Sequence, residues 1–73
     1  MKTTYWKRES ISTGEIVALF KIEETDKEMA GFIYKDGNWQ EYDDIVAKAR
    51  YEDDYDNITE KEANRIMQQM GLE

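Results

Sequence analysis

One segment, residues 15–23 (EIVALFKIE), places the strongest constraint on what this chain can fold into. It alternates as a β-strand does, and its centre is apolar on both faces. One face carries four apolar residues, Ile16, Ala18, Phe20 and Ile22. The other face carries Val17 and Leu19. We therefore expect this segment to be a middle strand of a β-sheet.

Three further segments are predicted to complete that sheet. Strands are predicted over residues 5–9 and 29–35. Turn-forming residues separate each of them from the central strand, residues 15–23. Asp36 and Gly37 follow the second of these segments. This dipeptide is typical of a two-residue hairpin turn, because both of its positions need a positive φ. Residues 38–42 then return as a short strand, so we expect an antiparallel meander of three or four strands over about residues 3–42.

The apolar period changes to that of a helix near residue 43. Apolar side chains recur at the spacing of one helix face, at Tyr42, Ile45, Val46 and Ala49. Acidic residues stand in the first turn and basic residues in the last, an order that complements the helix dipole. We expect a helix over about residues 43–51. Residues 52–57 break the period and are predicted to form a solvated loop.

A second helix is predicted over about residues 60–70. Thr59 followed by Glu62 matches a capping box, in which the hydroxyl accepts a hydrogen bond from the backbone of the first turn. The apolar stripe of this helix consists of Ala63, Ile66, Met67 and Met70. Gly71 suits the position just after the helix, where a positive φ is common. Leu72 and Glu73 are either native residues that close the helix end or a vector-derived scar.

These elements predict an α+β fold within a single small domain, residues 1–73. Its three- to four-stranded antiparallel β-meander is followed by two C-terminal α-helices. Because both helices follow the sheet in the chain, we expect them to pack on one sheet face and to leave the other face wetter. The rival architecture is a small, strongly bent half-barrel with a helical tail.

The residue types present argue against an enzyme. The chain contains neither cysteine nor histidine. It therefore lacks thiolate nucleophiles, the commonest general base and the usual soft-metal ligands. Asp54 and Asp56 begin an EF-hand-like pattern, but Ile58 and Thr59 stand where that pattern needs Asp or Asn and then Gly. We expect no catalytic site, no metal site and no cofactor.

The charge and the hydropathy indicate a compartment and a class of partner. The net charge is −7, and the acidic excess lies after residue 22. Proteins that bind nucleic acid directly need a basic surface, so we expect no direct nucleic-acid contact. The N-terminal residues lack the apolar stretch of a signal peptide, and no apolar run is long enough to span a membrane. We therefore expect a cytoplasmic protein that does not bind membranes.

Aromatic residues set among acids give a candidate interaction surface. Tyrosine and tryptophan are common contact residues, and acidic groups steer a basic partner. The candidate residues are Trp39, Tyr51, Asp53, Asp54, Tyr55 and Asp56. The alternative is structural: Trp39 covers the open face of the sheet or fills the gap under the first helix, and one or both tyrosines lie at the core edge. If the surface is functional, Trp39→Ala or Tyr55→Ala should weaken binding without unfolding the domain.

These observations favour a non-enzymatic protein–protein interaction module with an unknown protein partner. The alternative is an acidic nucleic-acid mimic that inhibits a basic DNA- or RNA-binding protein. The hairpin sequence DGNW and the capped C-terminal helix give a layout that resembles small bacterial or phage-derived proteins, a likeness that assigns no functional residue. We expect a monomer or a weak homodimer, for which Trp6, Trp39, Val17 and Leu19 are the candidate contact residues.

Overall fold

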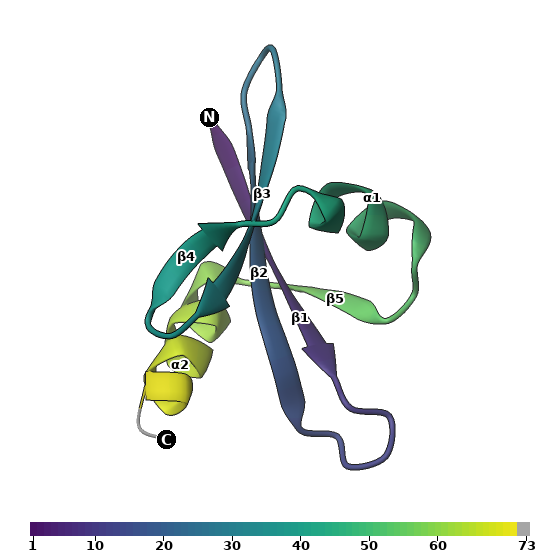
Figure 1. Cartoon of the computed structure of the whole chain (residues 1–73), viewed down its shortest axis with the longest axis vertical. Coiled ribbons are helices and arrows are strands. Elements are labelled where there is room, and N and C mark those ends of the chain that lie inside the picture. Colours follow the sequence, from purple (N-terminus) through teal and green to yellow (C-terminus); the bar gives the residue numbers. More distant parts are fainter. Residues whose placement is uncertain (72–73) are drawn as a thin grey trace.

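A computed structural model describes residues 1–71 and has an open five-stranded antiparallel sheet with two helices (Figure 1). The α+β prediction is therefore confirmed. In spatial order the strands run β4-β3-β2-β1-β5, so the central segment is the middle strand, as predicted. The elements in chain order are β1 (Lys2–Glu9), β2 (Ile16–Glu24), β3 (Met29–Lys35), β4 (Asn38–Glu41), α1 (Asp44–Tyr51), β5 (Tyr55–Ile58) and α2 (Glu60–Gly71).

The hairpin between β3 and β4 has the predicted tight turn. Lys35 pairs with Asn38 across it. Asp36 has φ 54° and Gly37 has φ 82°, so both central residues occupy the left-handed region. Glycine adopts this conformation freely, and aspartate is among the residues that tolerate it best. The two residues therefore fix where β3 ends and β4 begins.

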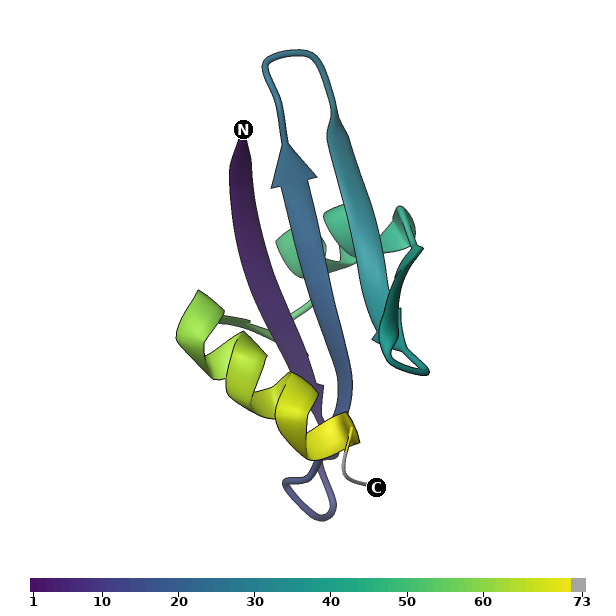
Figure 2. The ribbon, with the colours of Figure 1, turned by 90° about the vertical axis from the view of Figure 1, so that its left-hand side faces the viewer.

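The two helices pack on opposite faces of the sheet, so the expectation that both would cover one face is wrong. Phe20 and Ile22 of β2 lie in one buried cluster with Ile45 of α1. Leu19 lies in a second buried cluster with Ala63 and Ile66 of α2. Successive side chains of a strand point to opposite faces. Figure 2 accordingly shows the sheet between α2 in front and α1 behind it.

The segment that was predicted to be a solvated loop contains a strand, β5. It pairs antiparallel with β1, from Tyr5↔Ile58 to Arg8↔Tyr55. Tyr55 joins the α1 cluster and Ile58 packs against the α2 cluster. Two apolar residues in a run of four give almost no periodic signal, which is why the sequence did not indicate a strand. This edge strand takes the chain from the α1 side of the sheet to the α2 side.

A bulge near the start of β2 changes which residue faces which helix. The register between β1 and β2 shifts between Arg8 and Glu9, and this leaves Val17 without a partner residue in β1. On the N-terminal side of the bulge, Ile16 packs against the α2 cluster. The expectation that Ile16 shares a face with Phe20 is therefore wrong. An extra residue in one strand reverses the alternation beyond it.

The N-terminus of α2 has the predicted cap. The Thr59 hydroxyl accepts a hydrogen bond from the Glu62 backbone N–H at 3.2 Å. At the other end, α2 includes Gly71 as its last described residue, one position beyond the predicted end. The alternatives for Leu72 and Glu73 lie outside the described residues.

Candidate functional site

Trp39 belongs to the edge of the packed core on the α2 face. Its ring centroid lies 5.2 Å from that of Tyr34 and 6.4 Å from that of Tyr5. The Lys21 ammonium group lies 4.8 Å from the centroid of the Trp39 ring, within the range of a cation–π contact. The side chain is half-buried. This placement agrees with the structural alternative for Trp39.

Tyr55 is a core residue, with only 8% of its surface exposed. The Tyr55 ring packs edge-on against the Phe20 ring, with 5.4 Å between the two centroids. The Arg8 guanidinium lies 5.9 Å from the centroid of the Tyr55 ring. Because Tyr55 is buried, we expect Tyr55→Ala to destabilise the fold rather than to leave it intact. Removing a buried ring leaves a cavity.

The remaining predicted site residues are exposed but do not share one surface with the other two. Tyr51 is 78% exposed at the end of α1, and Asp53, Asp54 and Asp56 are also exposed. Trp39 and Tyr55 belong to clusters on opposite faces of the sheet. The six residues therefore cannot act as a single contact patch.

A groove opens where β2 and β3 separate, a feature that no pattern in the sequence indicates. The pairing between these strands ends at Phe20↔Ile33, and the last residues of β3 pair only with β4. Figure 1 shows the β3–β4 hairpin turning away from the first half of β2. The space has a volume of about 800 Å³. We call it the β2–β3 groove; its apolar lining consists of Ile16, Val17, Ala18, Ile33, Tyr34 and Met70.

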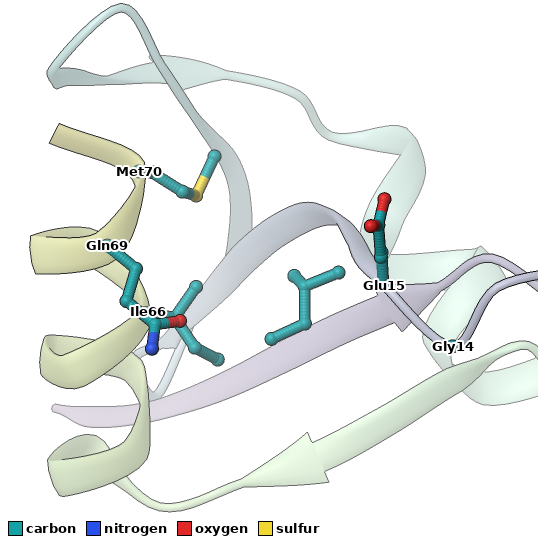
Figure 3. A pocket seen from close by; sticks show the side chains of 6 residues that line it. Gly14, Glu15, Ile66, Gln69 and Met70 are labelled. Carbon is teal, nitrogen blue, oxygen red and sulfur yellow. The ribbon is translucent and has the colours of Figure 1, made fainter. Parts of the chain in front are cut away.

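A second hollow adjoins this groove under the end of α2. It has a volume of about 440 Å³ and shares Ile16 and Met70 with the groove. Figure 3 shows Ile66, Gln69 and Met70 projecting from α2 on the side of Gly14 and Glu15. Methionine is flexible and polarisable, so Met70 can adjust to the shape of whatever lies beside it. The two hollows are therefore neighbours that share part of their lining.

Two exposed β-branched residues lie next to the groove. Ile11, in the turn between β1 and β2, is 96% exposed, and Val17 is 55% exposed. They line a further small hollow together with Asp54, and Val17 also lines the groove. The surface offered to a partner at this end of the sheet therefore extends beyond the groove. Leu19, the other central-strand residue considered for self-association, is fully buried and cannot contribute.

The charges around the groove favour a positively charged neighbour. Glu15 and Asp36 are exposed acids that line the two adjoining hollows. Lys35 is the basic residue among the described ones that line the groove. The last turn of α2, which supplies Met70, contains no basic residue to offset the negative end of the helix dipole. The local field therefore has the same sign as the net charge of −7.

Glu9 also lies close to this end of the sheet, but its side chain already has a charged partner. Its carboxylate forms an ion pair with Lys7 at 2.6 Å. The hydrogen bond from Lys7 to Glu9 is the main cause that raises the pKa of Lys7 above its usual value. Glu15 and Asp36, the acids that line the two adjoining hollows, form no such ion pair within residues 1–71.

Comparisons of the chain with models of protein families, with curated proteins and with solved structures gave no match. Within residues 1–71, no three acidic side chains gather closely enough to hold a metal ion. Neither described helix combines the length and the apolar character that crossing a membrane requires.

Proposed function

We propose that this chain is a non-enzymatic protein-interaction module whose contact surface is the β2–β3 groove together with Ile11 and Val17. The observation that carries the proposal is the separation of β2 from β3, which leaves a groove with both apolar and polar lining open at the end of the sheet. Contiguous exposed apolar surface commonly marks a site of protein contact. The absence of cysteine and histidine from the sequence supports a binding role over a catalytic one.

The exposed side chains offer a partner a clear gain in free energy. Fully burying a valine or isoleucine side chain is worth roughly 1.5–3 kcal/mol. Ile11 and Val17 contribute little to the core in the free protein, because most of each side chain is in water. A partner that covers both would gain hydrophobic stabilisation at little cost in rearrangement of the sheet.

The test compares two lysine substitutions at exposed apolar positions. Val17→Lys alters the proposed surface, whereas Tyr51→Lys makes the same change of charge at the far end of α1. Both variants and the parent chain are immobilised, and the protein captured from source-cell extract is quantified. We expect a partner that Tyr51→Lys retains and Val17→Lys loses. Circular dichroism confirms that both variants fold. Capture that is equal in all three chains would contradict the proposed surface.

The same experiment separates this proposal from nucleic-acid mimicry, which stays a prediction. A mimic would bind a basic nucleic-acid-binding protein through its acids, so DNA should displace that partner and rising salt should weaken the complex steeply. For the interaction module we expect a partner that DNA does not displace. Displacement by DNA together with no effect of Val17→Lys would favour the mimic.

A further inference from the structure

We infer that the β2–β3 groove takes an extended apolar segment flanked by basic residues, added as a short strand beside the first half of β2. This inference rests on the proposed function and specifies the chemistry of the partner and the way in which it binds.

The two sides of β2 are paired over unequal lengths. β1 follows β2 from Ile16 to Glu24, whereas β3 pairs with β2 only from Phe20 onward. A strand with a neighbour on one side only leaves the backbone groups of its other side open to a further strand. Adding an extended peptide to such an edge is a common mode of recognition. The groove lies at this open edge.

Apolar residues from both faces of the sheet line the groove. Ile16 and Tyr34 belong to the α2 face, and Ala18 and Ile33 belong to the α1 face. An inserted strand would direct its side chains alternately to these two faces. On the α2 face it would also meet Met70. Apolar residues in the middle of the segment therefore match the groove.

The rim of the groove is complementary in charge to a basic partner. Glu15 and Asp36 and the uncompensated C-terminal end of α2 all favour a cation, and Lys35 alone among the described lining residues opposes one. Lysine or arginine beside the apolar segment would pair with these acids. A second copy of this chain is a poorer occupant, because each copy carries a net charge of −7 and the copies repel.

The test uses a capped synthetic hexapeptide, lysine–threonine–valine–isoleucine–threonine–lysine, in which the two central apolar residues point to opposite sheet faces, titrated into the ¹⁵N-labelled full chain. NMR is suited to the weak binding that so short a peptide would show. We expect the amide signals of Ile16, Val17 and Ala18 to shift, and that of Asp26, at the opposite end of β2, to stay in place. An analogue with glutamate in place of both lysines should bind about tenfold more weakly, since attraction at the rim becomes repulsion.

Two further probes separate the strand from the charge. An analogue methylated on its central amide nitrogens keeps the side chains but cannot donate strand hydrogen bonds, so we expect its binding to be lost. Asp36→Asn removes one rim charge while retaining a residue type that tolerates the left-handed turn, and it should weaken binding of the lysine peptide about threefold. Asp26→Asn is the matched control, because it makes the same change of charge in the exposed turn at the opposite end of β2, and it should have no effect.

Each opposite result overturns a defined part of the inference. Equal affinity for the glutamate analogue would refute the basic partner, and full binding of the methylated analogue would refute strand addition. Shifts of the same amides on raising the concentration of the free chain would assign the groove to a second copy instead. If Val17→Lys loses the cellular partner but no peptide binds, the proposed function stands and this inference falls.

Discussion

Leu19 and Phe20 are neighbours in β2, yet Leu19 packs against α2 and Phe20 against α1. The sheet therefore separates two small cores, and a single strand supplies a central residue to each. A domain of this size buries a modest share of its surface, so neither core is expected to hold the fold without the other.

The first prediction follows from this division. Leu19→Ala should lower the free energy of unfolding by about 2–5 kcal/mol and Phe20→Ala by about 3–5 kcal/mol. Urea denaturation followed by circular dichroism measures both. Because either variant could fail to fold, Ile66→Val provides a milder change in the α2 core, with an expected loss of about 0.5–1.5 kcal/mol. No loss in Leu19→Ala would mean that α2 is not packed on the sheet.

A second prediction concerns the two tyrosines of the candidate surface. Tyr55→Ala should destabilise the fold by about 3–5 kcal/mol, because it removes a buried ring that contacts Phe20. Tyr51→Ala removes the same atoms from an exposed position and should change stability by less than about 0.5 kcal/mol. Thermal unfolding of the two variants side by side tests this difference. Equal melting temperatures would contradict the burial of Tyr55.

Gly31 gives a third prediction, based on close approach. A Cβ atom placed there would lie 2.5 Å from the Tyr42 carbonyl oxygen and would also overlap the Ile45 side chain. Gly31→Ala should therefore push α1 away from β3 and cost about 1–3 kcal/mol. Hydrogen exchange at Ile45 should accelerate in this variant. Unchanged stability and exchange would show that α1 does not sit as closely on the sheet as described.

The ion pair between Lys7 and Glu9 gives a prediction about pH. The pKa of Lys7 is raised in the folded chain, chiefly by its hydrogen bond to Glu9. A raised pKa stabilises the fold below the unfolded pKa of 10.5, and this stabilisation is lost as the pH rises through the folded pKa. Glu9→Gln should lower the pKa of Lys7, which an NMR titration of its side-chain carbon measures. A pKa that does not respond to Glu9→Gln would rule out the ion pair in solution.

Much of the fold was predictable, because its signals are local. The alternation of residues 15–23 identified the middle strand, and the left-handed preference of Asp36 and Gly37 placed the hairpin. The Thr59 cap located the start of α2. Each of these features depends on residues close together in the chain, so the amino-acid pattern alone is enough to specify it.

The candidate site was not predictable in the same way. The polar neighbours of Trp39 and Tyr55 in the sequence predict that both side chains are exposed, but burial depends on which other elements cover them. Tyr55 is covered because β5 pairs with β1, at the other end of the chain. The groove depends on where the ladder between β2 and β3 stops, and no local pattern marks that point.

The sequence by itself determined the central strand, the hairpin and the capped helix, because periodicity and turn chemistry act over a few residues. Only the tertiary structure decided that the two helices cover opposite faces, because the short edge strand β5 leads the chain from the α1 side of the sheet to the α2 side. It also decided that Ile16 faces α2, through the bulge at Val17. The tertiary structure likewise decided the opening between β2 and β3, since it depends on how far along these two strands their pairing extends before they diverge.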